Sequence, residues 1–167
     1  LYTWDNTQAL DARFFRERLR SAVAWRKQLG LDARDGAARL VFSEADGLSG
    51  LVVDRYGDYL VVQPTSLAMG QRLESIVAIL QELLQPRAIA LRAEKSMAQL
   101  EGVEVAEGHT WGELPAEPIT IREHGLAYEV DLHAGQKTGF YLDQRENRKR
   151  AAEQHGGIGE EARVRLD

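Results

Sequence analysis

The segment that most constrains the fold is an amphipathic stretch at residues 67–85. Its apolar side chains recur every three to four residues and its polar side chains occupy the other side, which predicts a helix that packs by one face; the apolar positions are Leu73, Ile76, Val77, Leu80, Leu83 and Leu84. Pro86 ends this helix, and residues 89–91 then have the pattern of a buried strand. Residues 51–55 and 59–63 precede it as a hairpin around a Tyr-Gly-Asp turn. A strand–strand–helix–strand order is therefore predicted for the centre of the chain.

Further elements are predicted on both sides of this unit. Apolar residues at helical spacing predict a helix over residues 7–29 that ends at Gly30, and residues 40–43 have the pattern of a short strand. Alternation predicts a second hairpin, 119–123 and 126–132, around His124-Gly125. Residues 143–155 are predicted to form a polar helix, and residues 162–166 the start of a strand. The predicted fold class is α+β, with a mixed or antiparallel sheet, hairpins and one packed amphipathic helix, flanked by N- and C-terminal helices.

Composition excludes several classes of protein. The 167 residues contain no cysteine, so a disulfide framework and a thiolate metal site are both excluded, which is compatible with a reducing cytoplasm. No apolar run approaches the roughly 20 residues that span a bilayer, so no membrane association is expected. The net charge of −5 is unevenly distributed, because residues 31–136 are acidic while residues 1–30 and 137–150 are each basic. Any contact with phosphates is therefore expected at the two basic flanks.

Acidic residues and histidines suggest a metal site only weakly. The acidic cluster matches no EF-hand spacing, and two of its members occupy turn positions where a carboxylate caps its own backbone; the cluster is Glu44, Asp46, Asp54 and Asp58. Hairpin geometry separates three of the histidines, which lack ligand spacing; these are His109, His124 and His133. No metal site is predicted.

The densest group of chemically useful residues is Gly-Gln-Lys-Thr-Gly-Phe-Tyr-Leu-Asp-Gln-Arg-Glu-Asn-Arg at 135–148. Gly135 and Gly139 permit a positive φ or close backbone approach. Phe140 and Tyr141 have flat faces that suit a base or an adenine ring, and Asp143 can cap the helix that follows. The alternative is a loop that two aromatic rings fix to the core, followed by a surface helix.

This segment resembles part of a family of S-adenosylmethionine-dependent methyltransferases that modify carbon-5 of cytosine in large-subunit ribosomal RNA. Residues 42–57, Phe-Ser-Glu-Ala-Asp-Gly-Leu-Ser-Gly-Leu-Val-Val-Asp-Arg-Tyr-Gly, and residues 112–115, Gly-Glu-Leu-Pro, are similar to the same family in the same order. The family combines an RNA-binding PUA domain, a central α+β domain and a Rossmann methyltransferase domain. The resemblance implies a linker helix at 1–36, the central domain at 37–134 and a connector at 135–167, with the Rossmann methyltransferase domain absent.

The resemblance also implies a function and a set of site residues. The parent protein would be an enzyme that makes 5-methylcytosine in ribosomal RNA with S-adenosylmethionine and no metal, in the cytoplasm. This chain would position RNA and form one wall of the cofactor site, beside the PUA and Rossmann domains. The residues expected at the cofactor are Lys137, Thr138, Gly139, Phe140 and Gln144. The residues expected at RNA are Arg145, Arg148, Lys149, Arg13 and Arg16.

The sequence predicts that the chain alone is inactive. Methylation of carbon-5 needs a nucleophile that saturates the cytosine ring, normally a cysteine thiolate, and the chain has none. It also lacks the strand, glycine-rich turn and helix that bind a cofactor in a Rossmann unit. One alternative is a non-catalytic RNA-binding or assembly module that uses the basic flanks, and another is a purely structural domain. An open sheet edge would also permit a homodimer.

Overall fold

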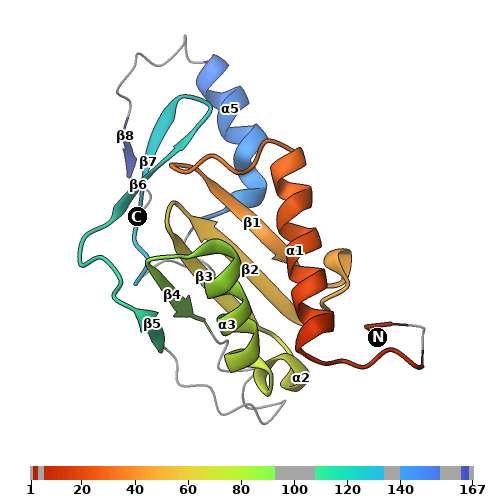
Figure 1. Cartoon of the computed structure of the whole chain (residues 1–167). Helices are drawn as coiled ribbons and strands as arrows, with labels where there is room; N and C mark the ends of the chain where they lie inside the picture. The colour runs from red at the N-terminus through yellow and green to blue at the C-terminus, as the bar shows by residue number, and fades with distance from the viewer. Residues whose placement is uncertain (1, 4–5, 93–107, 134–139, 155–162, 166–167) are drawn as a thin grey trace.

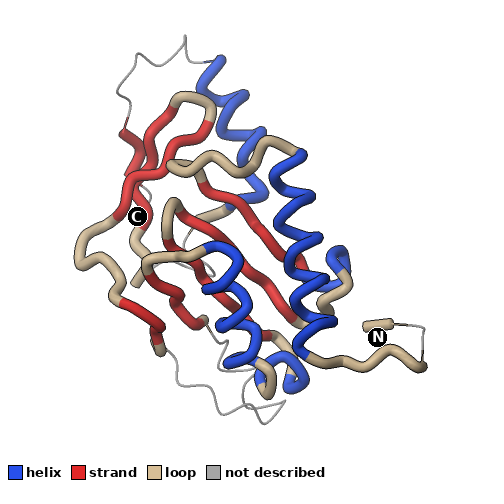
Figure 2. The backbone as a smooth tube through the Cα atoms, viewed as in Figure 1, coloured by secondary structure: helices blue, strands red, loops and turns tan. Residues whose placement is uncertain are grey.

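The computed structural model describes residues 2–3, 6–92, 108–133, 140–154 and, for the backbone alone, 163–165. Its strands form a five-stranded sheet in the order β1-β2-β3-β4-β5 and a three-stranded sheet in the order β6-β7-β8. Helices α1 and α3 run side by side across one face of the larger sheet, and the smaller sheet stands beside it (Figures 1 and 2). None of the described helices is long and apolar enough to span a bilayer.

The N-terminal helix α1 comprises Ala12–Gln28, a later start than the sequence predicts. Asp11 fixes this start because its side chain accepts a hydrogen bond from the amide of Phe14 at 3.0 Å. Gly30 follows the helix with a φ of +70°, which glycine adopts without strain. Phe14, Phe15 and Leu19 bury one face of α1 against the sheet.

The central unit follows the predicted order. Strand β1 (Ala37–Phe42) leads through the 3₁₀ helix η1 (Ser43–Asp46) to the hairpin of β2 (Leu51–Tyr56) and β3 (Tyr59–Pro64). The predicted single helix is instead two, α2 (Leu67–Gly70), capped by Ser66, and α3 (Leu73–Leu84). Strand β4 (Ala88–Leu91) then pairs with β3 in parallel, and β5 (Thr110–Gly112) completes the sheet antiparallel to β4.

The smaller sheet contains the second predicted hairpin, β6 (Ile119–Glu123) and β7 (Leu126–Val130), whose turn places His124 at a φ of +52°. Strand β8 (Arg163–Arg165) pairs with β7 in parallel. Between them in the chain lie the 3₁₀ helix η2 (Leu142–Gln144) and helix α5 (Arg145–Gln154). The predicted C-terminal helix and strand are thus present.

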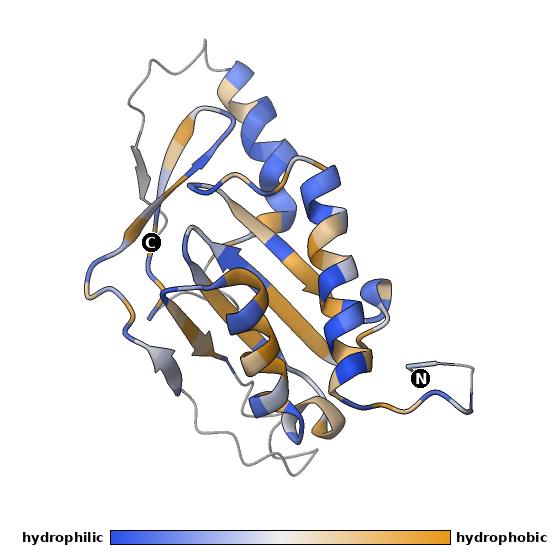
Figure 3. Cartoon of the chain, in the orientation of Figure 1, coloured by the Kyte–Doolittle hydropathy of each residue, from blue (hydrophilic) through white to orange (hydrophobic). Residues whose placement is uncertain are grey.

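Two apolar cores lie on opposite faces of the larger sheet. The first is formed by α1, α3 and residues such as Leu60 and Val62 of β3. The second includes Val61 of the same strand, together with Tyr128 of β7 and Phe140. Because successive strand residues point to opposite faces, β3 contributes to both cores. Figure 3 shows the corresponding hydropathy, with largely apolar strands behind helices in which polar and apolar residues alternate.

Candidate functional site

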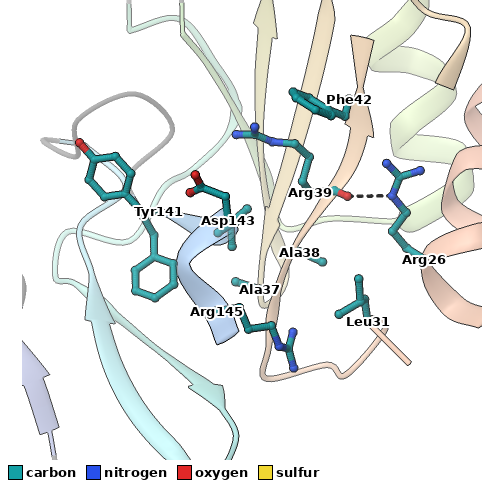
Figure 4. Close-up of a pocket in the computed structure, with 11 residues that line it drawn as sticks. Arg26, Leu31, Ala37, Ala38, Arg39, Phe42, Tyr141, Asp143 and Arg145 are labelled. Atoms are coloured by element: carbon teal, nitrogen blue, oxygen red, sulfur yellow. Dashed lines mark hydrogen bonds between the residues drawn. The ribbon is translucent and has the colours of Figure 1, made fainter. Parts of the chain in front are cut away.

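A cavity of about 410 Å³ lies between β1, the end of α1 and the segment 140–145. It joins parts of the chain that are about one hundred residues apart in sequence, and Figure 4 shows the side chains around it. The lining residues are Arg26, Leu31, Ala37, Ala38, Arg39, Phe42, Phe140, Tyr141, Leu142, Asp143 and Arg145. The cavity is therefore lined in part by residues 140–143 and 145 of the 135–148 motif.

Strand pairing builds the β1 wall. Arg39 stands directly opposite Asp54 on β2, and a bulge follows between Arg39 and Val41. The fully buried Asp54 accepts hydrogen bonds from Arg39 Nε at 2.8 Å and from Nη2 at 3.0 Å, and hydrogen bonding to Asp54 raises the pKa of the guanidinium. The guanidinium of Arg39 also lies 5.3 Å from the ring centre of Phe42. These contacts hold a planar cation and an aromatic ring at the cavity.

Arg26 joins the end of α1 to the same wall. Its Nε donates to the carbonyl oxygen of Arg39 at 2.9 Å, the bond drawn in Figure 4. Its Nη2 donates to Asp46 at 2.7 Å, while Asp46 also accepts from the amide of Phe42 at 2.6 Å. Two of the arginines at the cavity, Arg26 and Arg39, therefore each have a carboxylate partner.

The opposite wall is the segment 140–145, in which two adjacent aromatic rings have different environments. Phe140 is only 5% exposed and packs edge-on against Tyr128, with ring centres 5.5 Å apart. Tyr141 is 45% exposed and lines the cavity. Phe140 also lines the cavity, although most of its ring is buried in the second core, so the prediction that it contacts a cofactor stays a prediction. Tyr141 is the ring of the pair that remains accessible.

Arg148 stabilises the segment 140–145 through contacts with Phe140 and Tyr141. Its Nε donates to the buried carboxylate of Glu123 at 2.7 Å, and its Nη1 donates to the carbonyl oxygen of Tyr141 at 2.7 Å. The guanidinium also lies 4.1 Å from the ring centre of Phe140. With its side chain 15% exposed, Arg148 is placed as an internal anchor and not as a surface cation.

The other predicted residues of this region are placed as follows. Lys137, Thr138 and Gly139 lie outside the described residues. Gln144 is exposed, and its side-chain oxygen accepts a hydrogen bond at 2.6 Å from the neighbouring Asn147. Arg145 lines the cavity and donates to His124 Nε2 at 3.3 Å, while Lys149 is exposed on α5.

The two predicted RNA contacts on α1 are not brought to this cavity. Arg13 pairs with Glu17 at 3.0 Å, and Arg16 pairs with Glu82 of α3 at 2.8 Å. At 1.5 Å per helical residue, they lie about 15–20 Å along the axis from Arg26. Arg13 and Arg16 therefore belong to a different region of the surface from the cavity.

Three residues of the site were not predicted from the sequence. Arg26 was included only in the predicted helix at 7–29, and Phe42 only in the family match at 42–57. Arg39 was not singled out. A signal for Arg39 existed, since registering residues 37–42 against 51–56 places it opposite Asp54. Nothing in the sequence indicated that Arg26 would reach β1.

The acidic residues considered for a metal site are engaged elsewhere. Asp46 and Asp54 pair with Arg26 and Arg39, and Asp58 lies 3.4 Å from Arg34. Glu44 accepts a hydrogen bond from Ser49 at 2.6 Å, which helps lower the pKa of its carboxyl to about 2. Within the described ranges, no group of three or more potential ligands is placed to hold a metal ion.

Known proteins resemble the chain over most of its length. A protein of Klebsiella pneumoniae named ribosomal RNA large subunit methyltransferase I is 40% identical over 150 residues, which is 89% of this chain and 37% of that protein. Its namesake in Cronobacter sakazakii is 38% identical over 148 residues, again 89% of this chain and 37% of the relative. The resemblance inferred from the sequence is confirmed. The chain spans little more than one third of the length of these relatives. No model of a known protein family matches it.

Solved structures resemble the chain in fold. A crystal structure of a protein assigned as a methyltransferase, in complex with SAH, has a TM-score of 0.73 at 21% identity. The match covers 96% of this chain and 46% of that one. A protein from Streptococcus mutans assigned as a SAM-dependent methyltransferase gives the same TM-score, identity and coverage.

These structures correct the predicted fold class. The expectation that the Rossmann methyltransferase domain is absent is wrong, because nearly the whole chain superposes on methyltransferase chains. The mixed pairing is consistent with a Rossmann-like fold, since β3 and β4 are parallel neighbours connected through α2 and α3, and β7 and β8 are parallel neighbours with α5 between them in sequence. Such parallel pairs depend on a long crossover connection, which leaves no local pattern like that of a hairpin.

Proposed function

We propose that the chain is part of an S-adenosylmethionine-dependent methyltransferase that acts on large-subunit ribosomal RNA, with carbon-5 of a cytosine as the target atom. The observation that carries this proposal is the 40% identity to ribosomal RNA large subunit methyltransferase I across 89% of the chain. The SAH complex of a protein with the same fold supports S-adenosylmethionine as the cofactor.

In this proposal the segment 135–145 forms one wall of the cofactor and RNA site. Lys137, Thr138 and Gly139 contribute to cofactor binding together with Gln144, which is exposed next to Tyr141 and Asp143. Arg145 and Lys149 are four residues apart on α5, so they can follow an RNA backbone on one side of the helix. Arg148 supports the wall through Glu123 and the carbonyl oxygen of Tyr141.

The chemical step requires residues beyond these 167. Carbon-5 of cytosine becomes nucleophilic only after a thiolate adds to the ring, and the chain contains no cysteine. We therefore place the nucleophile elsewhere in the enzyme. This chain orients the base and the cofactor but does not transfer the methyl group alone.

RNA binding by the chain tests the proposal directly. Fluorescence anisotropy with a large-subunit ribosomal RNA fragment is expected to show affinity that falls steeply with salt, because bound lysines and arginines release counterions. Lys149→Gln is expected to reduce the slope of log affinity against log salt by about 0.7–0.9 for one lost phosphate contact. Arg87→Gln is the matched control, since Arg87 is 71% exposed and belongs to neither the cavity nor the basic flanks. Equal slopes for both variants would contradict the proposed contact.

A methyl-transfer assay separates the enzyme from a binding module. The chain with labelled S-adenosylmethionine and the same RNA is expected to transfer no label, and calorimetry is expected to detect cofactor binding. RNA binding with no affinity for S-adenosylmethionine or SAH would favour the non-catalytic module instead. Transfer of label by the chain alone would overturn the assignment of the nucleophile to another part of the enzyme.

A further inference from the structure

We propose that the cavity between β1 and the segment 140–145 binds one unpaired nucleobase that carries an exocyclic amino group. This inference rests on the proposed function, because it names the part of the RNA that the cavity recognises. It differs from the phosphate contacts of α5 in the chemistry of the ligand and in the dependence of binding on salt.

Two accessible aromatic rings support stacking in the cavity. Phe42 is 52% exposed and Tyr141 is 45% exposed, although both residue types are usually buried. They belong to the two different walls, β1 and the segment after Phe140 (Figure 4). Proteins that hold single-stranded RNA use such rings as platforms on which unstacked bases rest. The volume of about 410 Å³ lies within the range of small-ligand sites and suits a nucleoside.

The charges of the cavity favour an uncharged ring over a phosphate group. The positive charges of Arg26 and Arg39 are compensated by Asp46 and Asp54, whose carboxylates are almost fully buried. Asp143 adds a further negative charge beside Arg39 (Figure 4), and Arg145, the third arginine of the lining, adds a positive one, so these charges sum to zero. The electrostatic attraction of an anion to the cavity would therefore be weak, whereas the binding of a neutral planar base does not depend on such attraction.

The polar groups of the cavity select a type of base edge. Asp143 offers carboxylate oxygens, which accept from an exocyclic amino group such as N4 of cytosine. Arg39 has five N–H donors, two of which go to Asp54, so others can donate to a ring acceptor. Cytosine and adenine carry an amino group next to a ring nitrogen acceptor. Uracil carries a carbonyl in place of the amino group and an N–H in place of the ring acceptor, so its donor and acceptor are exchanged and would face the carboxylate and the guanidinium in the wrong order.

The test compares single-stranded oligonucleotides of cytidine, adenosine and uridine by fluorescence anisotropy. Phe42→Ala and Tyr141→Ala are each expected to weaken binding of the cytidine oligomer about 5- to 100-fold, because each removes a stacking face. The slope of log affinity against log salt is expected to stay unchanged, since no phosphate contact is lost. Asp143→Asn is expected to remove the preference for cytidine and adenosine over uridine.

Trp25→Ala is the matched control, because Trp25 is an aromatic residue with 54% exposure that does not line the cavity. Equal losses in Trp25→Ala and Phe42→Ala would overturn the base site, as would a smaller salt slope in Phe42→Ala or Tyr141→Ala. Wild-type affinity in these two variants, with weakened binding in Lys149→Gln, would also overturn it while leaving the RNA function intact.

Cytidine without phosphate provides an independent measurement by NMR. Its addition is expected to shift backbone amide resonances of residues 37–42 and 140–145, and uridine is expected to shift them less. If these shifts occur but anisotropy detects no binding of the RNA fragment, the base site is supported and the proposed function is contradicted. Shifts confined to residues outside these two ranges would overturn the base site.

Discussion

At the scale of single residues, Arg148 determines how the aromatic pair at 140–141 is presented. One guanidinium contacts the carboxylate of Glu123, the carbonyl oxygen of Tyr141 and the ring of Phe140. Glu123 is only 2% exposed, so its carboxylate has little contact with water and pairs with Arg148 instead. The same contacts keep Phe140 in the core and leave Tyr141 at the cavity.

Replacing Arg148 is therefore expected to cost more than replacing any exposed cation of α5. Arg148→Gln leaves the Glu123 carboxylate buried without its partner, and we expect a loss of about 3 kcal/mol in the free energy of unfolding. Urea denaturation measures this loss. Arg150→Gln, on the exposed side of the same helix, is the control and should remain within about 0.5 kcal/mol of the wild type. A similar effect of both substitutions would show that Arg148 is not the anchor.

At the scale of elements, the edge strand β5 depends on a close backbone approach. Gly112 pairs with Ala88 of β4 and has a φ of +83°. A Cβ atom at this position would lie 2.5 Å from the carbonyl oxygen of Arg87. Because that neighbour is backbone, it cannot rotate away, and the close pairing of β4 with β5 requires glycine.

A pair of glycine substitutions separates contact from conformation. Gly112→Ala is expected to destabilise the chain by about 2–3 kcal/mol, from both the clash and the positive φ. Gly108→Ala has nearly the same φ, +81°, but its Cβ would meet no atom of the described residues within 4 Å, so about 1 kcal/mol is expected. Thermal and urea unfolding measure the difference. Equal losses would mean that the contact with Arg87 is relieved at no cost.

At the scale of the whole molecule, Arg92 connects the larger and the smaller sheet by hydrogen bonds. It follows β4 directly, and its Nη2 donates to the carbonyl oxygens of Leu132 and His133, which follow β7. His133 in turn contacts the carbonyl oxygen of Pro115 through Nε2 at 2.9 Å. These bonds fix Leu132 and His133, which precede the 135–148 motif in the chain.

Arg92→Met is expected to loosen this connection. It removes two hydrogen bonds from a charged donor, for which we expect a loss of about 2 kcal/mol in the free energy of unfolding. Hydrogen exchange is expected to accelerate most at the amides of β7. Arg87→Met is the matched control, because Arg87 is largely exposed and its nearest carboxylate oxygen, on Asp58, lies 3.6 Å away. Unchanged exchange of β7 in Arg92→Met would show that apolar packing alone joins the sheets.

Local sequence patterns were sufficient to predict the elements and much of their order. The apolar stripe of α3, the turn between β2 and β3 and the His124-Gly125 turn are local signals, because each depends on residues that are near one another in the chain. The 135–148 motif and the family resemblance were also readable, since they depend on residue order alone. The interruption between α2 and α3 was not predicted.

The identity of the side chains that meet at the cavity depends on tertiary packing and was not predictable from local patterns. Phe140 and Tyr141 are adjacent aromatics in the sequence, but the second core takes one ring and leaves the other accessible. Arg148 and Lys149 are adjacent cations, but only Arg148 reaches the buried Glu123. The parallel pairing of β3 with β4 and the approach of β1 to residues 140–145 join distant segments. Such contacts follow from how the sheets and helices pack, and no local pattern of residues contains that information.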